Sequence, residues 1–299
     1  MRTLNSAIVA SLLVAAAGYA CSDQQASNGL GDAGAAGVSD AGAAGDTSEG
    51  GSGGAADAAA GAAGADAGGG ESTGGASGAN GDSQPNLSGI RVRFVGAPQI
   101  HGTSTETELA DLIGSETGLS PTRIHSGAGA PALVAADLSG VDVAVIESLL
   151  REYSAAEATL VADWVATGHG LIVLNGFTID STRAATFAAS YGVTFGFIIQ
   201  QTTPVYVSTF AAHPITAGVS SLYFSGGFPM ATTDPAAVPF ASIGSATVGL
   251  ALAYGAGRVA LWGDDWIVLS EEVTRVDSQG AHPTAAFWKN ALSWASKRD

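Results

Sequence analysis

Four carboxylates near the C-terminus are the clearest candidates for a reactive or cation-binding group. Asp264 and Asp265 come just after an apolar run, and Glu271 and Glu272 follow shortly after them. Carboxylate oxygens bind hard cations such as Ca²⁺, and a pair of carboxylates supplies the acid and base of glycoside hydrolysis. The spacing is diagnostic of neither, since an acidic protein also carries such residues in solvated loops. We therefore predict no cofactor, assign no metal site, and keep a metal-assisted or carboxylate-based hydrolase as an alternative function.

Two histidines are candidate site residues. His101 lies in the loop after the first predicted strand, and loops are where binding and catalytic residues concentrate. His213 precedes a proline in an irregular segment, where a histidine acts either as a base or as a structural hydrogen-bonding group. Between residues 89 and 299 no serine lies in a G-x-S-x-G sequence, so a serine nucleophile of that type is not indicated. Four tryptophans offer either a sugar-stacking platform or core packing, and we expect core packing: Trp262, Trp266, Trp288 and Trp294.

The only cysteine of the chain is Cys21. This excludes a nucleophilic cysteine, a disulfide framework and a multi-cysteine metal site in the remainder. Cys21 follows a basic Arg2, an apolar run at residues 7–17 and small residues up to Ala20, which is the layout of a secretory signal peptide. The apolar run is shorter than the roughly 20 residues that a bilayer-spanning helix needs.

The position of Cys21 also resembles the processing site of bacterial lipoproteins, because it stands directly after Ala20 and before the polar residues 22–25. The resemblance implies that residues 1–20 are a lipoprotein signal peptide and that Cys21 becomes an acylated N-terminus held in the lipid bilayer. With Ser22 after the cysteine, it implies an outer-membrane lipoprotein of the bacterial cell envelope. The alternative is ordinary secretion with cleavage after Ala20 and a free thiol.

Residues 21–88 have the composition of a disordered tether. Between residues 22 and 88 there are 19 glycines, nine acidic residues and no aromatic or basic residue, so this stretch cannot bury enough apolar surface to fold. A glycine-rich coil of that length reaches roughly 45 Å. The net charge of −16 argues against nucleic acid as a partner, since such affinity comes mostly from lysine and arginine. Residues 89–299, which hold all five tryptophans, are predicted to form one folded domain.

The first half of that domain alternates predicted strands and helices. A serine and a glutamate three residues apart, Ser154 and Glu157, form a capping box that opens a helix ending near Gly168. The other elements are strands at 90–95, 141–146 and 171–174 and helices at 105–113 and 181–190. Short connections between alternating elements predict a doubly wound, mostly parallel α/β sheet.

The second half is richer in strands, at 193–199, 205–208, 248–254 and 258–262, and a final helix starts after Pro283. The last two strands read as a hairpin with a three-residue loop at 255–257. The predicted fold class is therefore α/β, a flavodoxin-like three-layer sandwich with an antiparallel strand addition in the C-terminal half. Ligands of such sheets bind outside the carboxyl ends of the parallel strands. We expect the following residues to line that crevice: Gly96, His101, Glu147, Asn175, His213, Asp264 and Asp265.

Several phrases in this order resemble one family. They are LIVLNG at residues 171–176, HPITAGV at 213–219, GRVALWGDDW at 257–266 and FWKNALSW at 287–294. Together they resemble the class I glutamine amidotransferase-like (flavodoxin-like) superfamily, in the branch that includes ThuA-like domains, over residues 89–299. The resemblance implies that the 257–266 phrase is a late strand whose carboxyl end borders the crevice.

Active members of that superfamily use a cysteine on a turn after a central strand, with a histidine and a glutamate from a late loop. The corresponding turn here, residues 174–177, holds no cysteine, and Thr284 stands where His282-Pro283 would be followed by the glutamate. The resemblance therefore implies a domain that lacks the catalytic cysteine and is not an active amidotransferase.

The expected function is a non-catalytic domain, displayed at the cell envelope, that binds an envelope glycan or a protein partner. The alternative hydrolase would act on extracytoplasmic carbohydrate and would use Asp264, Asp265 and His101. A third interpretation is a degenerate relative whose crevice is filled by side chains.

Overall fold

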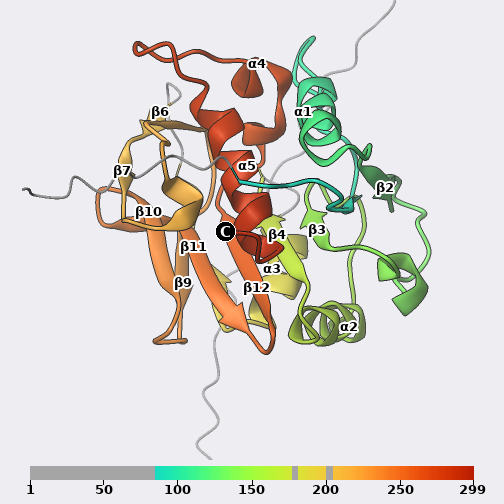
Figure 1. Ribbon diagram of the computed structural model, residues 1–299. Coiled ribbons are helices and arrows are strands. Elements are labelled where there is room, and N and C mark those ends of the chain that lie inside the picture. The colour runs from blue at the N-terminus through green and yellow to red at the C-terminus, as the bar shows by residue number, and fades with distance from the viewer. Residues whose placement is uncertain (1–84, 177–180, 200–204) are drawn as a thin grey trace, which may run out of the picture. The chain divides into compact units, whose positions relative to one another are not determined.

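A computed structural model describes residues 85–176, 181–199 and 205–299 of the chain (Figure 1). Cys21, the signal segment and nearly all of the predicted tether lie outside the described residues. Within the described part, an eight-stranded sheet runs in the order β2-β1-β3-β4-β12-β11-β10-β7. No helix among these residues is long and apolar enough to cross a bilayer.

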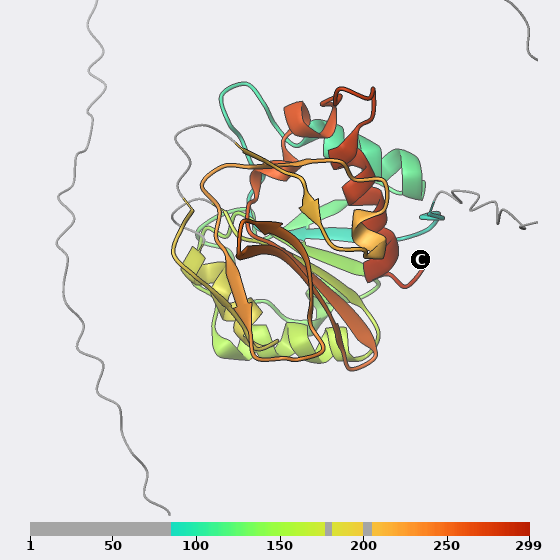
Figure 2. The same cartoon turned by 90° about the vertical axis from the view of Figure 1, so that its left-hand side faces the viewer.

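One half of the sheet is parallel and the other half is antiparallel. Its parallel strands are β2 (Thr122–Ile124), β1 (Val92–Val95), β3 (Val143–Ile146), β4 (Gly170–Leu174) and β12 (Gly257–Trp262). This 2-1-3-4-5 order is the flavodoxin-like one. The antiparallel extension consists of β11 (Ala246–Tyr254), β10 (Val238–Ile243) and β7 (Thr209–Phe210), and Figure 2 views the molecule from that side. The predicted fold class is confirmed.

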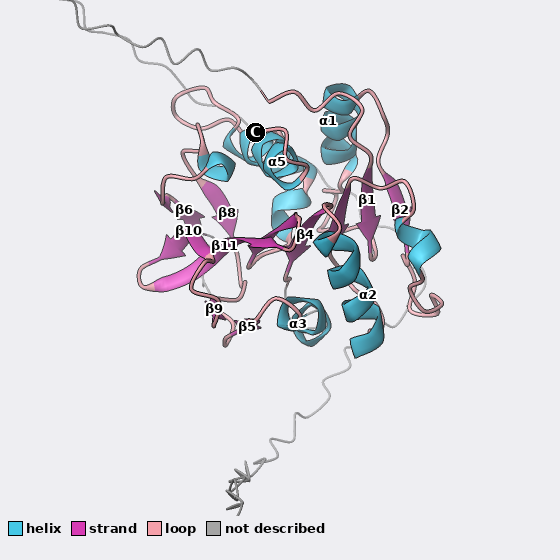
Figure 3. Ribbon diagram, turned by 60° about the horizontal axis from the view of Figure 1, so that its bottom comes forward, coloured by secondary structure: helices cyan, strands magenta, loops and turns pink. Residues whose placement is uncertain are grey.

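Helices cover both faces of the sheet (Figure 3). On one face lie α1 (Thr107–Thr117) and α5 (Pro283–Ala295), and on the other lie α2 (Ala155–Ala166) and α3 (Ser181–Ala189). Side chains of each strand alternate between the two faces. In β3, for example, Val143 and Val145 join the α1/α5 core, whereas Ala144 and Ile146 join the α2/α3 core. The result is the expected three-layer sandwich.

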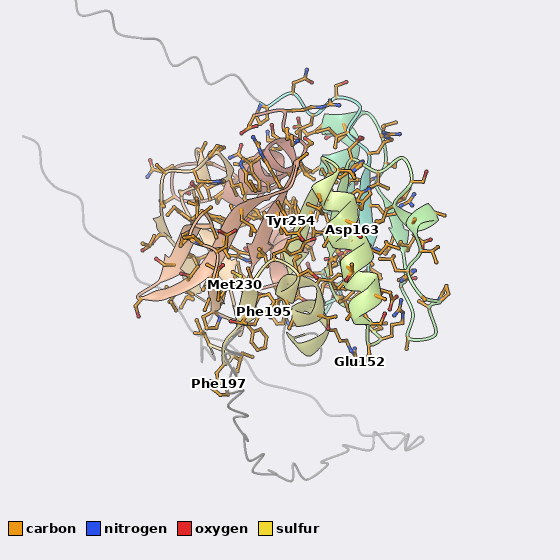
Figure 4. The ribbon with its side chains drawn as sticks, turned by 90° about the horizontal axis from the view of Figure 1, so that it is seen from below. Glu152, Asp163, Phe195, Phe197, Met230 and Tyr254 are labelled. Atoms are coloured by element: carbon orange, nitrogen blue, oxygen red, sulfur yellow. The ribbon has the colours of Figure 1, made fainter. Side chains whose placement is uncertain are left out.

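Shorter elements complete the description. Two small sheets pair β5 (Val193–Phe195) with β9 (Met230–Thr232) and β6 (Val205–Val207) with β8 (Leu222–Phe224). Figure 4 shows Phe195 and Met230 close together, with Phe197 beyond them at the surface. Three 3-10 turns and one short helix remain: η1 (Ala135–Leu138), η2 (Pro214–Thr216), η3 (Trp266–Val268) and α4 (Ser270–Val273).

Two of the sequence predictions need correction in detail. The β11–β12 hairpin has a two-residue loop, Gly255-Ala256, because Tyr254 pairs directly with Gly257. Gly255 takes the left-handed conformation, with φ of +57°, that such tight hairpin turns require. The strand predicted at 193–199 ends at Phe195, since its partner β9 is only three residues long.

Of the four tryptophans expected in the core, three belong to it. Trp262 and Trp288 are completely buried, and Trp262 packs in tilted contact with Phe287 at 5.7 Å between ring centroids. Trp294 is nearly buried in the same α1/α5 layer. Trp266 is the exception, because it stays partly exposed beside His101.

Candidate functional site

The candidate site lies where β1 and β3 end, which is the switch point of a flavodoxin-like sheet. Gly96 directly follows β1 with φ of +123°, and a Cβ atom there would fall 1.7 Å from the carbonyl oxygen of Glu147. Only glycine allows the chain to pass this closely over the end of β3. The structure thus brings Gly96 and Glu147 together.

A single guanidinium joins two carboxylates at this place. Arg123, in β2, donates from Nη2 to Oε1 of Glu147 at 2.7 Å and also to Oε2 of Glu106, the residue before α1. Its Nη1 donates to the carbonyl oxygen of Gly96 at 3.0 Å, and its guanidinium lies 4.7 Å from the ring centroid of Phe94. The side chains of Glu147, Glu106 and Arg123 are 0%, 9% and 20% exposed. This is therefore a nearly buried ion-pair group.

A third carboxylate, that of Asp265, reaches the same edge from the segment after β12. It lies over Gly176, where a Cβ atom would fall 1.8 Å from its Oδ2. Gln99 links it to the ion pairs: the side-chain amide of Gln99 donates to Asp265 Oδ2, and its backbone N–H donates to Glu106 Oε1. We call Gln99, Glu106, Arg123, Glu147 and Asp265 the carboxyl-edge cluster.

The carboxyl-edge cluster carries more acids than bases, and its pKa values reflect this. Burial raises the pKa of Glu147 well above its usual value, the negative charges of Glu106 and Asp265 add to the rise, and Arg123 opposes it. Burial also raises the pKa of Glu106, although Arg123, the Gln99 N–H and a hydrogen bond with Glu147 limit the change. Glu147 therefore keeps its proton to a higher pH than an ordinary glutamate does.

A cavity of about 360 Å³ opens beside the cluster, between β1, β2 and α1. Gln99, Glu106 and Arg123 form part of its wall, together with Phe94, Thr105 and Ala110. Small-molecule sites typically measure about 300–1,000 Å³ and combine apolar walls with a few polar groups. The cavity has both properties.

Among the described residues Asp264, unlike its neighbour Asp265, accepts hydrogen bonds from backbone N–H groups only. It is 1% exposed, its Oδ1 accepts the Trp266 N–H at 3.0 Å, and its Oδ2 accepts the Ser225 N–H. Burial raises the pKa of Asp264 to about 7, against the lowering effect of these two hydrogen bonds. Asp264 thus fixes the two backbone segments to each other and offers no free oxygen to a ligand.

His101 lies at the rim of the crevice. Its ring packs 4.2 Å from that of Trp266, and Nδ1 is 3.8 Å from Oε1 of Glu271, with both side chains 55% exposed. The loop carrying His101 is fixed to α4 by Ser270, whose N–H donates to the Thr105 carbonyl at 2.6 Å. His101 is accessible but does not belong to the buried cluster.

Two expected crevice residues lie elsewhere. Ile146 of β3 pairs with Val173 of β4, so Asn175 lies one residue farther along than Glu147 and points to the opposite, α2/α3 face. Asn175 is completely buried, and its side-chain amide finds no partner among the described residues.

His213 does not line the crevice, and this prediction was wrong. It caps the η2 turn, where its Nδ1 accepts the Ile215 N–H at 3.2 Å. Its ring packs 5.2 Å from that of Trp294, near the end of α5. Burial and the positive charge of Arg258, at the amino end of β12, lower its pKa. His213 therefore belongs to the opposite edge of the sheet and has a structural role.

The four carboxylates that first suggested a cation site do not act together. Glu272 pairs with Arg275 at 2.9 Å, Glu271 faces His101, and Asp264 binds backbone N–H groups. Across residues 85–176, 181–199 and 205–299, no group of three or more His, Cys, Asp or Glu side chains is placed to hold a metal ion.

Three residues of the cluster were not anticipated from the sequence: Gln99, Glu106 and Arg123. Arg123 lies in a strand of only three residues, too short to show alternation. Glu106 immediately precedes α1, and a helix start predicted two residues too early places it inside the helix. The scarcity of basic residues was the available signal, because an arginine in an acidic chain that becomes buried needs carboxylate partners.

Comparison with known proteins finds similar folds among solved structures but no similar sequence family. No protein-family model matches the chain, and no curated protein matches its sequence. Among solved structures, the mmIFT52 N-terminal domain is 13% identical with a TM-score of 0.52, covering 68% of this chain and 96% of that one. The cytoplasmic protein STM1381 from Salmonella typhimurium LT2 is 18% identical with a TM-score of 0.50, covering 69% and 99%.

A putative ThuA-like protein from Bacteroides uniformis ATCC 8492 is a more distant match, 12% identical with a TM-score of 0.44, covering 70% of this chain and 92% of that one. At these identities, the likeness to the first two structures concerns the fold alone. This chain therefore shares with them a flavodoxin-like α/β architecture.

Proposed function

We propose that this chain is an envelope lipoprotein, anchored through acylated Cys21, whose α/β domain binds a small polyhydroxylated ligand such as an envelope glycan. The observation that carries the binding function is the cavity of about 360 Å³ beside the carboxyl-edge cluster. The cavity lies between β1, β2 and α1, beside the switch point between β1 and β3 where flavodoxin-like sheets bind ligands.

The cavity wall carries both hydrogen-bond donors and hydrogen-bond acceptors, which the hydroxyl groups of a ligand can use. Glu106 and the Thr105 hydroxyl can accept hydrogen bonds, whereas Arg123 and Gln99 can donate them. Phe94 and Ala110 contribute apolar parts of the wall. A few polar groups in fixed positions within an apolar wall give orientation and specificity to a small ligand.

The same wall favours binding over hydrolysis. Glycoside hydrolysis needs two carboxyl groups flanking the scissile bond. Of the described residues that line the cavity, only Glu106 is a carboxylate. Asp264, which the alternative function would use, has both oxygens bound to backbone N–H groups.

A thermal-shift titration of the full-length chain with glucose, galactose, mannose and N-acetylglucosamine tests the binding function. A ligand at 100 times its dissociation constant should stabilise the protein by about 2.7 kcal/mol. Ala110→Phe should fill the cavity and abolish the shift, whereas Asp111→Asn, at an exposed position of the same helix, should leave it unchanged. No shift with any of these sugars would refute this function. Release of sugar from a nitrophenyl glycoside, if Glu106→Gln abolishes it, would support the hydrolase instead.

The anchor has a separate test in bacterial cells. Cys21→Ser should abolish incorporation of labelled palmitate and move the protein from the membrane fraction to the soluble fraction. Full incorporation by the variant would rule out Cys21 as the lipidated residue.

A further inference from the structure

His125 directly follows β2, and its side chain is only 5% exposed. Its backbone is left-handed, with φ of +56°, a conformation that residues other than glycine rarely adopt. The imidazole ring is stacked on the ring of Tyr153, with 5.9 Å between the centroids. A strained backbone of this kind persists only where surrounding contacts hold it. The contacts of the His125 ring therefore fix the end of β2.

The neighbours of the two ring nitrogens determine the protonation state of His125. Nδ1 lies 3.2 Å from the Tyr153 hydroxyl and 3.3 Å from Nη2 of Arg151. An arginine nitrogen only donates hydrogen bonds, so Nδ1 is the acceptor and carries no proton. The proton of the neutral ring is then on Nε2, which faces Oδ2 of Asp137 at 3.7 Å. The buried position thus fits a neutral His125.

A second proton does not fit this position. It would bind Nδ1 and bring two positive charges, those of His125 and Arg151, to within 3.3 Å of each other. The Tyr153 hydroxyl can accept from the new N–H, but it cannot cancel the repulsion. Asp137 is 28% exposed, and the carboxylate of Glu157 is already paired with Arg151. Burial and Arg151 therefore lower the pKa of His125, and Asp137 and Glu157 oppose this change only in part.

The loop after His125 has few side chains with which to hold itself to the domain. Residues 126–129 are Ser-Gly-Ala-Gly, and all four are exposed. Beyond them the Pro131 carbonyl accepts an N–H of Arg151 at 2.8 Å, which fixes the far end of the loop. The near end is fixed by the His125 ring. Withdrawal of that ring would free the loop between β2 and Pro131.

We propose that His125 is a protonation switch: a proton on its ring expels the ring from between Arg151 and Tyr153, frees residues 126–130 and uncovers these two side chains. The inference is independent of the proposed binding function and of the lipid anchor. The pKa of His125 is lower in the closed conformation than its ordinary value of 6.5, so protons favour the open conformation. The closed conformation is therefore favoured above pH 6.5 and gives way to the open one as the pH falls below that value.

A spin label on the loop measures this release. With Cys21→Ser the full-length chain has no cysteine left, so Ala128→Cys places a single nitroxide at an exposed position of the loop. Between pH 7.5 and 5 we expect the motion of this label, read from its EPR spectrum, to become at least about twofold faster. A label at Ser245→Cys, in the exposed turn between β10 and β11, should show no such change.

Two variants separate a switch from a histidine that is merely structural. His125→Asn cannot be protonated, its side-chain oxygen can accept a hydrogen bond in the place of Nδ1, and asparagine tolerates a left-handed backbone. In this variant the pH dependence of the loop label should disappear. Asp137→Asn removes a carboxylate that favours the protonated ring, so it should move the midpoint of the change to lower pH. An NMR titration of the His125 ring should give the same midpoint as the label.

Three results would overturn the inference. The first is a loop label whose motion stays constant from pH 7.5 to 5. The second is an equal change in His125→Asn, since another group would then be responsible. The third is a His125 titration whose midpoint differs from that of the label. Should His125→Asn not fold, Asp137→Asn decides, and an unchanged midpoint in that variant counts against the switch.

Discussion

Two of the nearly buried glutamate–arginine groups of this domain differ in how fully the carboxylate is bound. At the start of α2, Glu157 accepts hydrogen bonds on both oxygens: Oε1 from the Leu133 N–H at 2.7 Å, and Oε2 from the Ser154 N–H at 2.9 Å. Arg151 donates to both oxygens as well. In the carboxyl-edge cluster, Glu147 has one oxygen on Arg123 and the other without a donor among the described residues.

The pKa values record this difference. Burial alone would raise the pKa of Glu157, but hydrogen bonds from Arg151, Ser154 and Leu133 outweigh it and lower the pKa to about 2. For Glu147 the effect of burial is larger than that of Arg123, so its pKa is raised. Arg123 is shared with Glu106, and the negative charges of Glu106 and Asp265 raise the pKa further. An ion pair that lowers the pKa of its acid stabilises the fold. A buried ion pair that leaves the pKa of its acid raised is instead a candidate for a functional site.

The largest effect on folding should come from Glu157→Gln. Removing one partner of a buried ion pair costs about 3–5 kcal/mol, and we expect a loss near 3 kcal/mol in the free energy of unfolding at pH 7, measured by urea denaturation. Glu152 provides the matched control, because it is 74% exposed and pairs with Arg183 at 3.2 Å (Figure 4). Glu152→Gln should change stability by less than about 0.5 kcal/mol. Equal effects of the two substitutions would contradict the comparison.

Acid should remove the contribution of Glu157. Because its folded pKa of about 2 lies below the ordinary value of 4.5, its stabilisation is complete above pH 4.5 and is lost as the pH falls toward 2. The change is at most about 1.4 kcal/mol per pH unit. Urea titrations at pH 6, 4.5 and 3 should therefore show the difference between the wild type and Glu157→Gln shrinking with acid. A constant difference would argue against the lowered pKa.

A smaller effect than that of Glu157→Gln should come from the same substitution in the other group, Glu147→Gln. Glutamine resembles the protonated form, which the raised pKa of Glu147 favours, so we expect a change in the free energy of unfolding under about 1 kcal/mol. A raised folded pKa stabilises the wild type below the unfolded pKa, and this is lost as the pH rises through the folded value. The variant should therefore gain stability relative to the wild type between pH 5 and 8. A loss near 3 kcal/mol at pH 6 would show that both groups are structural.

Local patterns of the sequence predicted local structure well. The capping box of Ser154 and Glu157 forms as expected, because both of its hydrogen bonds lie within one turn of chain. The apolar run at 171–174 is a central strand buried on both faces. Alternation of strands and helices was enough to predict the doubly wound sheet.

The candidate site was predicted only in part, because its contacts join distant segments. Glu106, Arg123 and Glu147 meet through the pairing of β1 with β2 and β3, and no local pattern specifies that register. Asn175 was assigned to the same crevice because it follows a strand, but a one-residue offset in register turns its side chain to the other face. Glu147 and Asp265, which the sequence did indicate, lie directly after buried strands or close to them.

Both outer strands of the eight-stranded sheet are very short, β2 with three residues and β7 with two. A long, flat edge offers a row of unpaired backbone groups to which another chain can add. Here each border presents only a few such groups. Copies of this domain lying side by side would therefore have little backbone at these two strands through which to join their sheets.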